Sequence, residues 1–435
     1  MLQKFISCVT KLAQNTYTMK EHYSTLVIGG GTGGIMIASQ LIERGLEKDI
    51  AIIEPAEYHY YQPAWTLVGA GTYKFEDTKR PMSSVMPKAA DWIKQKVTKI
   101  VPEENKVILD SDKSITYDYL VVSPGLKHDF SLVPGLQEAM EDPNSGVGSV
   151  YTDPEKVWKN INNFKGGVAL FTQPTTPIKC GGAPQKIMYL AEAAFKKQGK
   201  RDQTKVVFAT NGGVIFGIKP VKETLMKVVD RKSINLKFGH NLVEIDPIEM
   251  IAWYKLGDNK GEHNDLGIET LEKDGMVGIK YDFLHTAPPS VAPDFVKEAG
   301  LTNEGGWMDV DQYSLQHKKY KNIFGIGDVA SLPTAKTGAA IRKQVPVVID
   351  NLEKLKKGNE NFDKIYNGYS SCPLVTEYGK MVLAEFDYEG NFTPDPKLKW
   401  MLIGDSSKEH WRLWMLKKYG LPYLYWNKMM KGKDV

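Results

Sequence analysis

Most of the fold follows from one segment, Tyr23-Ser-Thr-Leu-Val-Ile-Gly-Gly-Gly-Thr-Gly-Gly34. Its apolar half predicts a buried strand, and residues 35–44 have the pattern of a helix. Between them lies the spacing Gly29-x-Gly31-x-x-Gly34, which is typical of a turn that binds a dinucleotide. We expect Gly29 to permit the tight turn, Gly31 to let the backbone approach a pyrophosphate, and Gly34 to let the helix pack on the strand.

An acidic residue at the right distance supports this interpretation. Residues 49–53 predict a second strand, which ends in Glu54, 20 residues after Gly34. A carboxylate there can accept hydrogen bonds from a ribose, and the helix N-terminus would face the phosphates. Strand, helix, second strand and acid together favour a nucleotide-binding domain over a glycine-rich turn without a ligand.

Composition narrows the class of protein. The 435 residues leave room for two or three domains, and 42% of them are hydrophobic and 25% charged. A net charge of only +4 does not suggest a nucleic-acid binder. No uninterrupted apolar stretch has membrane-spanning length, so we expect any membrane association to be at the surface. Three cysteines cannot make a disulfide framework, which favours a reducing compartment. We assign no metal site.

The N-terminal segment, residues 1–20, resembles a mitochondrial presequence. It contains Lys4, Lys11 and Lys20, several serines and threonines, and no acid. It lacks arginine, so a disordered tail is the alternative. Cys8 lies here, and we expect it to take no part in chemistry.

The chain after Glu54 is aromatic and glycine-rich over residues 55–71, which include Gln62. Such a segment could lay side chains along a flat cofactor, or it could be a loop packed by its own aromatics. Residues 91–101 and 106–110 predict strands of a small meander. Residues 117–125 predict a buried strand that ends in a turn and returns the chain to the first sheet.

A second α/β unit is predicted by a strand at 167–171, a helix at 183–198 and a strand at 205–209. The glycines that follow, at positions 212, 213 and 217, do not give the dinucleotide spacing. A bulky Ile215 or Phe216 stands where a third glycine is needed. This loop therefore argues against a second dinucleotide such as NAD(P)H.

A further short strand, residues 320–328, ends in Asp328, with Lys336 eight residues on and a helix expected from Gly338. The carboxylate could accept from a ribityl hydroxyl, and the helix N-terminus could favour negative charge at a flavin pyrimidine. Asp328 could also simply cap that helix.

The C-terminal region, from about residue 351, ends in a stretch of aromatic and basic side chains. Such side chains suit the boundary between water and lipid. The expected interfacial anchors are Trp411, Trp414, Tyr423, Tyr425 and Trp426, with Lys417, Lys418 and Lys428 attracting anionic headgroups. The alternative is a helix pair docked on the body of the protein or on a second subunit, so a homodimer stays open.

Two cysteines are candidates for redox chemistry. Cys180 lies just ahead of a helix that we expect to begin at Pro184, with Lys179 and Lys186 close in sequence, and each feature favours thiolate over thiol. Cys372 lies in a segment that looks like a turn entering a strand. The two are 192 residues apart, so the sequence does not show them adjacent, and two inert buried cysteines are the alternative.

These motifs resemble those of the mitochondrial-type sulfide:quinone oxidoreductases, a branch of the flavoprotein disulfide reductases. The resemblance runs from about Tyr23 to Lys431 and is most specific around the two cysteines. Its carriers are the glycine loop, Glu54-Pro followed by Tyr-Tyr-Gln62-Pro-x-Trp-Thr-Leu-Val-Gly-Ala-Gly71, Ile178-Lys-Cys180-x-Gly-Ala-Pro-Gln-Lys, Gly325-Ile-Gly-Asp328 and Ser371-Cys372-Pro-Leu-Val.

The resemblance implies an α/β fold of two Rossmann-like dinucleotide-binding-type domains plus a C-terminal membrane-associating region. We expect a targeting segment at 1–20, a discontinuous FAD-binding domain at 22–150 and 275–350, and a second Rossmann-like domain carrying Cys180 at 151–274. The C-terminal region, 351–435, would carry Cys372. FAD would be held by Gly29, Gly31, Thr32, Gly33, Gly34, Glu54, Gln62, the backbone near Val97, Asp328 and Lys336.

The resemblance also implies a reaction and a place in the cell. Hydrosulfide would attack the sulfur bridge between Cys180 and Cys372, and the thiolate that delivers two electrons to the flavin would be Cys372. Glutathione, sulfite or cyanide would remove the sulfane sulfur, and ubiquinone would accept the electrons at the mitochondrial inner membrane. Some relatives carry a third cysteine where this chain has Val329, so we assign that position no role.

Two other functions fit part of the pattern. A type II NADH:quinone reductase has the same fold and membrane habit, but it needs a working second glycine loop and has no use for two cysteines. A non-catalytic FAD-binding scaffold or redox sensor would use the fold without turnover. Sulfide bleaching a flavin, with quinone restoring it, would separate all three.

Overall fold

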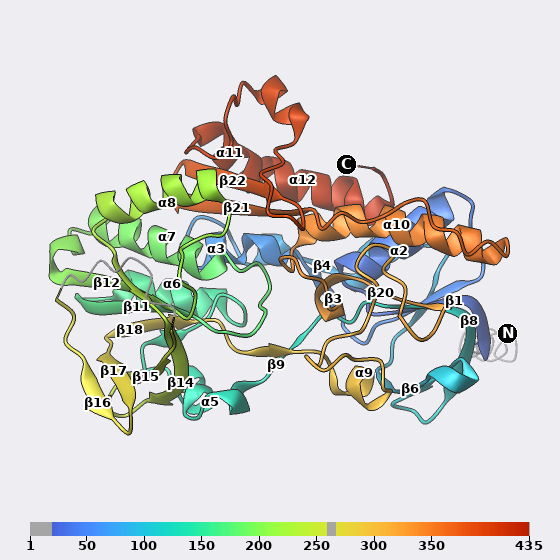
Figure 1. Cartoon of the computed structure of the whole chain (residues 1–435), viewed down its shortest axis with the longest axis horizontal. Helices are drawn as coiled ribbons and strands as arrows, with labels where there is room; N and C mark the ends of the chain where they lie inside the picture. The colour runs from blue at the N-terminus through green and yellow to red at the C-terminus, as the bar shows by residue number, and fades with distance from the viewer. Residues whose placement is uncertain (1–19, 259–266, 435) are drawn as a thin grey trace, which may run out of the picture.

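A computed structural model of the chain describes residues 20–258 and 267–434. The predicted targeting segment, with Cys8, therefore lies outside the described residues, apart from Lys20. The elements form two lobes, each built on its own sheet, with C-terminal elements lying across both (Figure 1).

The first lobe confirms the strand–turn–helix predicted at the glycine loop. Apolar runs with no polar interruption suit strands that are covered on both faces, and β1 pairs in parallel with β2 on one side and β8 on the other. β20 pairs with β8, so a distant part of the chain completes this sheet. The bounds are β1 His22–Ile28, α2 Thr32–Glu43, β2 Ile50–Ile53, β8 Ser114–Val122 and β20 Ile323–Gly325.

The prediction of one strand over residues 91–101 was wrong. The structure has two strands, β5 (Asp91–Ile93) and β6 (Val97–Val101), separated by the polar residues Lys94, Gln95 and Lys96. β5 extends the parallel sheet beside β2, whereas β6 pairs antiparallel with β7 (Lys106–Leu109). The polar break lets the chain leave one pairing and begin the other.

The second lobe has the predicted α/β unit. β11 lies between β12 and β18 in a parallel sheet, and α7 packs against β11 and β12. An antiparallel sheet of β14, β15, β17 and β16 extends this lobe (Figure 1). The bounds are β10 Val147–Gly148, α6 Pro154–Asn163, β11 Gly167–Gln173, α7 Ala183–Lys197, β12 Thr204–Thr210, α8 Lys219–Arg231, β13 Asn235–Phe238, β14 His240–Asp246, β15 Ile251–Leu256, β16 Leu271–Lys273, β17 Met276–Lys280 and β18 Phe283–Thr286.

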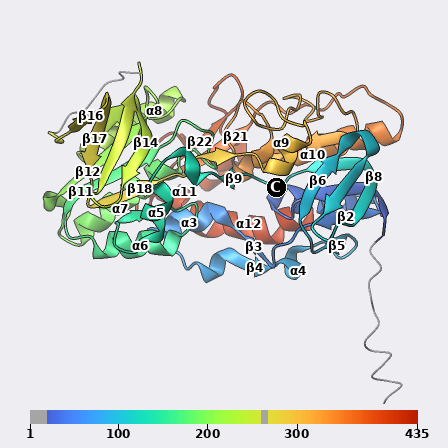
Figure 2. The same ribbon diagram turned by 90° about the horizontal axis from the view of Figure 1, so that it is seen from below.

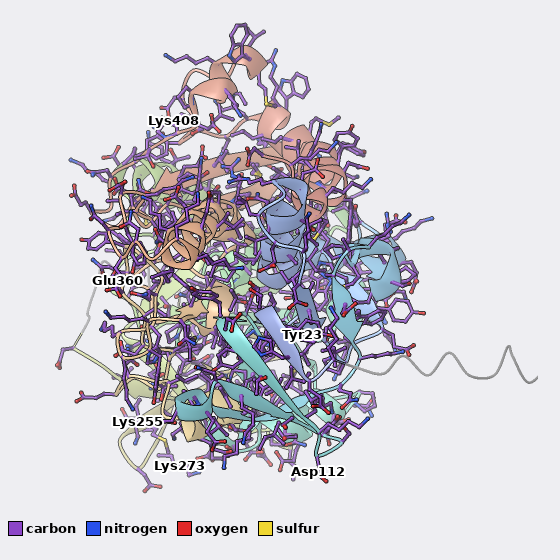
Figure 3. The ribbon with its side chains drawn as sticks, turned by 90° about the vertical axis from the view of Figure 1, so that its right-hand side faces the viewer. Tyr23, Asp112, Lys255, Lys273, Glu360 and Lys408 are labelled. Atoms are coloured by element: carbon purple, nitrogen blue, oxygen red, sulfur yellow. The ribbon has the colours of Figure 1, made fainter. Side chains whose placement is uncertain are left out.

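The C-terminal elements join the lobes. α10 (Gly338–Lys356) packs on α2, the hairpin of β21 (Ser370–Glu377) and β22 (Lys380–Phe386) packs on α7, and α12 (Leu421–Asn427) lies between the lobes when the molecule is seen from below (Figure 2). Between β22 and α11 (Trp411–Met415) the chain forms the short helix η7, Pro396–Met401. Seen from the side, the segment near Lys408 stands out from the body (Figure 3).

Candidate active site

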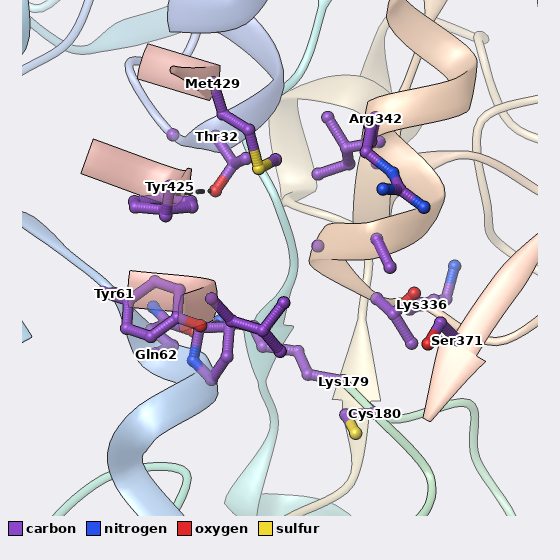
Figure 4. A pocket seen from close by; sticks show the side chains of 18 of the residues that line it. Thr32, Tyr61, Gln62, Lys179, Cys180, Lys336, Arg342, Ser371, Tyr425 and Met429 are labelled. Carbon is purple, nitrogen blue, oxygen red and sulfur yellow. Dashed lines mark hydrogen bonds between the residues drawn. The ribbon is translucent and has the colours of Figure 1, made fainter. Parts of the chain in front are cut away.

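A cavity of about 760 Å³ opens between the two lobes (Figure 4). Its walls come from the glycine loop, the aromatic segment after Glu54, the loop that carries Cys180, the first turn of α10, and the C-terminal elements. Segments far apart in the sequence therefore meet at one space that is large enough for an extended cofactor together with a second ligand.

The glycine loop has the geometry that the spacing predicted. Gly29 has a φ of +97°, and a Cβ there would lie 2.4 Å from the carbonyl oxygen of Ser123. A Cβ on Gly34 would lie 1.9 Å from the carbonyl oxygen of Gly29, which explains how α2 approaches the strand so closely. A Cβ on Gly31 would meet nothing within 4 Å, because this residue faces the cavity. Of these three glycines, only Gly31 has space beside it for a ligand.

The Glu54 carboxylate lines the cavity and braces the loop. Its Oε2 accepts a hydrogen bond from the backbone N–H of Gly30 at 2.7 Å, and its Oε1 accepts from that of Ala56 at 2.7 Å. Carboxylate oxygens have further lone pairs, so Glu54 keeps the capacity to accept from the hydroxyls of a ribose.

Most of the site residues predicted from sequence line this cavity, but some do not. The residues in its wall are Gly31, Thr32, Gly33, Glu54, Gln62, Cys180, Asp328 and Lys336. Gly29 and Gly34 act behind the wall through the contacts just described. Val97 packs instead with the apolar core under the first sheet, so the structure does not bring it to the cavity.

The two cysteines meet although 192 residues separate them. Their sulfurs lie 3.8 Å apart. Cys180 has a φ of +47°, and its backbone N–H donates to the carbonyl of Lys336 at 2.7 Å. Cys372 is 3% exposed and lies within β21 rather than in a turn before it, which corrects the sequence interpretation. A Cβ on Gly182 would lie 2.5 Å from the Cys372 sulfur, so this glycine makes room for the pair.

Two buried lysines, one on α7 and one in the C-terminal region, lie near the cysteine sulfurs. Lys186 on α7 donates from Nζ to the Cys180 sulfur at 3.0 Å. Lys417, in the π-helical segment Leu416–Gly420 between α11 and α12, donates to the carbonyl of Pro63 at 2.6 Å. Burial, and next the charge of Lys186, lower the pKa of Lys417 to about 7. Burial opposes the charge on Lys186 too, but the cysteines raise its pKa above the ordinary value.

These contacts shift the pKa values of the two cysteine thiols in opposite directions. A hydrogen bond from the Cys372 thiol, helped by the Lys186 ammonium, holds the pKa of Cys180 well below its usual range. The same hydrogen bond, together with burial, raises the pKa of Cys372. In the reduced pair these shifts favour the thiolate at Cys180, which lines the cavity (Figure 4), whereas Cys372 is not among the lining residues.

Lys179 does not stabilise the thiolate of Cys180, although its position in the sequence suggested that it would. Its Nζ donates to the Gln62 side chain at 3.1 Å, across the cavity wall (Figure 4). Sequence reasoning also missed Tyr151, whose hydroxyl donates to the carbonyl of Cys180 at 3.2 Å. No sequence motif marks this tyrosine, because its contact with Cys180 forms between two loops of the second lobe that are 29 residues apart.

Lys336 connects the cysteine loop to the segment after β20. Its backbone receives the hydrogen bond from Cys180, and its Nζ donates to the carbonyls of Asp328 and Ala330 at 2.7 and 2.9 Å. Burial lowers the pKa of Lys336 to about 8. The Lys336 side chain can therefore bring positive charge to a ligand beside the first turn of α10.

The C-terminal stretch is partly an interior element, which corrects its description as a row of surface anchors. The Tyr425 hydroxyl bonds Thr32 Oγ1 at 2.8 Å and His59 Nε2 at 2.5 Å, and His59 Nδ1 bonds the carbonyl of Gly30 at 3.0 Å. Burial lowers the pKa of His59 to about 4, so this ring is neutral. α12 therefore closes the cavity against the glycine loop.

The exposed aromatics lie elsewhere in the C-terminal region. Trp414 and Lys417 are buried, whereas Trp411 and Tyr423 are exposed. In this region the most exposed large apolar side chains are Trp400 on η7, 87% exposed, and Leu402 directly after it, 75% exposed. Within the described part of the chain, no helix combines the length and apolarity needed to cross a membrane. The same residues contain no group of acidic, histidine or cysteine side chains that could hold a metal ion.

Comparison with known proteins gives the following similarities. Residues 23–160 match the family described as pyridine nucleotide-disulphide oxidoreductase. The chain is 41% identical to a protein of Mus musculus named mitochondrial sulfide:quinone oxidoreductase, over 95% of this chain and 88% of that protein.

Two solved structures share the fold. The sulfide:quinone oxidoreductase of Aquifex aeolicus has a TM-score of 0.73 at 23% identity, covering 95% of this chain and 92% of that one. A chain in the Tetrahymena thermophila mitochondrial ATP synthase has a TM-score of 0.77 at 24% identity, covering 96% and 98%. At these identities the likeness concerns the fold alone.

Proposed function

Because the chain belongs to the sulfide:quinone oxidoreductase family, we propose that it oxidises hydrogen sulfide with a cysteine pair and FAD and passes two electrons to ubiquinone. The observation that carries this proposal is the meeting of Cys180 and Cys372, 3.8 Å apart, at the wall of a cavity that also contains a dinucleotide-type glycine loop. A pair of thiols at this separation can form a disulfide or hold a bridging sulfur after small movements.

The residues present fit a flavin dinucleotide. The open space at Gly31 and the N-terminus of α2 suit a pyrophosphate, Glu54 suits a ribose, and Lys336 with the first turn of α10 suits negative charge on a flavin ring. We propose that Gln62 and Asp328 contribute to the same site. When bound, FAD would supply two-electron redox chemistry between the thiols and a quinone.

The chain's own residues would act as follows. Hydrosulfide attacks a sulfur of the oxidised pair, so that one S–S bond forms, another breaks, and a thiolate leaves. The Lys186 ammonium attracts the anion and stabilises the negative charge on sulfur. Glutathione, sulfite or cyanide then attacks the outer sulfur and regenerates the thiolate. The division of roles implied by the family, with Cys372 as electron donor, stays a prediction, and in the reduced pair it is the pKa of Cys180 that is lowered.

Single replacements of the cysteines test this function. Cys180→Ser and Cys372→Ser should each abolish sulfide-dependent quinone reduction while FAD stays bound, since a hydroxyl cannot carry sulfane sulfur. Cys8→Ser is the matched control and should leave turnover unchanged. Supplying glutathione, sulfite and cyanide in turn would identify the preferred acceptor. Wild-type turnover in either of the first two variants would contradict the paired-cysteine reaction.

We also propose that the protein docks on the mitochondrial inner membrane through η7 and the exposed part of the C-terminal region. Trp400 and Leu402 offer a strongly exposed apolar tip, and Lys397, Lys399 and Lys408 provide positive charge beside it. Aromatic and basic side chains together suit an anionic lipid surface. A homodimer that covers this surface is the competing arrangement, and liposome binding distinguishes the two.

A further inference from the structure

The part of the cavity that is lined by η7 and its neighbours is mostly apolar, and we call it the chamber beneath η7. Its walls come from β22, from η7 and from the helical segments that follow α11, and the apolar side chains are Leu383, Leu398, Met401, Leu416, Leu421 and Leu424. Within this lining stands one guanidinium, that of Arg342 on the second turn of α10 (Figure 4). A charged group in such surroundings needs a partner, because burying an unpaired charge is costly.

We infer that Arg342 binds a carbonyl oxygen of the quinone headgroup and that Tyr369 and Glu385 position it. This inference rests on the proposed function and names the quinone-contacting side chains within it. It assigns the chamber beneath η7 to the electron acceptor and leaves the glycine-loop end of the cavity to the dinucleotide.

A chain of hydrogen bonds fixes the guanidinium. Arg342 Nη2 donates to the Tyr369 hydroxyl at 2.8 Å, and that hydroxyl donates to Glu385 Oε1 at 2.5 Å. Glu385 is buried, and its Oε2 accepts from the backbone N–H of Asp395 at 2.9 Å. The network therefore runs from α10 across the hairpin to the start of η7, and it ties the guanidinium to the element that roofs the chamber.

The guanidinium keeps most of its donors free. Arginine has five N–H groups, and the bond to Tyr369 is the only hydrogen bond that Arg342 makes with the described residues. Its Nε is buried without a hydrogen-bond partner among them, and the arginine ion pairs of the described residues are those of Arg44, Arg201 and Arg231. A ligand that offers an acceptor oxygen and otherwise apolar surface would satisfy these donors, and a quinone ring has that chemistry.

The chamber also connects with the surface proposed for membrane docking. Met401 lines the chamber, while its neighbours Trp400 and Leu402 are among the most exposed apolar side chains of the described residues. An isoprenoid tail could therefore remain in lipid while the ring reaches Arg342. This continuity favours a membrane-soluble acceptor over a water-soluble anion as the partner of the guanidinium.

The redox chemistry balances without a proton from Arg342. Hydrosulfide gives up two electrons and one proton as its sulfur passes to the cysteine pair, and reduction of a quinone to a hydroquinone takes up two electrons and two protons. Solvent supplies the second proton. The part of the Arg342 guanidinium is to stabilise the negative charge that develops on the quinone oxygen as electrons arrive.

The test uses Arg342→Met, with Tyr369→Phe as a milder second variant and Lys357→Met, at the exposed end of the same helix, as the charge-matched control. Three quantities are measured on flavin-loaded protein: bleaching of the flavin by sulfide, the dissociation constant of a short-tailed ubiquinone analogue by calorimetry, and reoxidation by that quinone. We expect Arg342→Met to weaken quinone binding and slow reoxidation by roughly ten- to a hundredfold, as for loss of a charge-assisted hydrogen bond. Tyr369→Phe should show a smaller loss of the same kind, and sulfide bleaching should be normal in all variants.

Each other outcome is decisive. Normal quinone affinity and normal reoxidation in Arg342→Met would overturn the inference. So would purification of that variant without flavin while Tyr369→Phe keeps both flavin and normal quinone binding, because Arg342 would then belong to the flavin site. If sulfide does not bleach the flavin of the wild-type protein, that result would contradict the proposed function itself, whatever the variants do.

Discussion

The charge on the cysteine pair is set by side chains that come from three parts of the chain. Lys186 follows Cys180 by less than two helical turns and was visible in the sequence, whereas Lys417 and Cys372 arrive from the C-terminal region. The sequence therefore predicted an activated cysteine but not which partner activates it. Close approach of two sulfurs and an ammonium in a buried site lowers the pKa of Cys180.

This charge state predicts selective alkylation. In the reduced protein at neutral pH, iodoacetamide should modify Cys180 before Cys372, and Lys186→Met should slow the reaction because removing the ammonium raises the pKa of Cys180. Lys179→Met, whose Nζ contacts Gln62 instead, is the control. Mass spectrometry of the cysteine peptides measures both rates. An unchanged rate in Lys186→Met at neutral pH would show that this lysine does not stabilise the thiolate.

A pH-dependent stability effect is expected at Lys417. Its pKa is about 7 in the folded protein against an ordinary 10.5, mainly because of burial. Below pH 7 the folded state carries the full penalty of a buried charge. Between pH 7 and 10.5 the unfolded chain binds a proton that the folded protein does not, so stability contributed by this group rises with pH.

The Tm of Lys417→Met minus that of the wild type should therefore fall as the pH is raised from 6.5 to 9.5. Thermal unfolding of both proteins across this range gives the comparison. The partly exposed neighbour, Lys418→Met, should show a difference that does not vary with pH in this way. A constant or rising difference for Lys417→Met would mean that Lys417 is charged in the folded protein throughout the range.

At the scale of elements, the glycine loop gives a clean test of the cofactor site. Gly31→Leu should fold but purify without colour, because its side chain would enter the space proposed for the pyrophosphate. Gly404→Leu is a matched control, since a Cβ at this exposed glycine also meets nothing within 4 Å. The flavin absorbance per mole of folded protein measures the effect. If Gly31→Leu is yellow and loaded with flavin, the pyrophosphate does not bind at this loop.

The tip of η7 is the element we expect to contact lipid. Deleting residues 408–435 would not test this, because that deletion removes Tyr425 and Lys417 from the cavity wall. Replacing Trp400 and Leu402 with serine should instead weaken binding to anionic liposomes while leaving the flavin in place. Each lost side chain removes about 2 kcal/mol of apolar burial.

Sedimentation with liposomes measures the binding of the variant to lipid. The control is the double variant Ile248→Ser with Leu256→Ser, which removes two exposed apolar side chains from the second lobe. We also expect the η7 variant to lose more turnover with long-tailed than with water-soluble quinone. Undiminished liposome binding of the η7 variant would place the lipid contact elsewhere or assign the tip to a protein partner.

Which elements could be predicted depended on how local their signals are. β1, β2, β11 and β12 are parallel strands buried on both faces, so continuous apolar runs identified them. The aromatics of α12 gave an ambiguous signal, because tyrosine and tryptophan suit a packed interior as well as a lipid interface. Burial against the glycine loop decided between the two for Tyr425, and only the tertiary structure shows that contact.

At the scale of the whole molecule, the site exists because two lobes and a C-terminal region close around one cavity. The family resemblance grouped the glycine loop, Glu54 and the two cysteines before their positions were known. It also placed the backbone near Val97 at the cofactor, but Val97 is partly buried against the core of the first sheet and is not among the residues that line the cavity. The Arg342 network carried no sequence signal, since its members come from α10, from the residue before β21 and from β22 and meet only in three dimensions.

The measurement that tests this account most directly is the absorbance of the flavin-loaded protein under anaerobic conditions. Sulfide should bleach the oxidised flavin, and a ubiquinone analogue added afterwards should restore it, with quinone reduced in proportion to sulfide consumed. NADH should leave the flavin oxidised, because residues 211–217 lack a second dinucleotide spacing. A flavin that sulfide leaves unchanged, or that NADH bleaches as fast as sulfide does, would contradict the account.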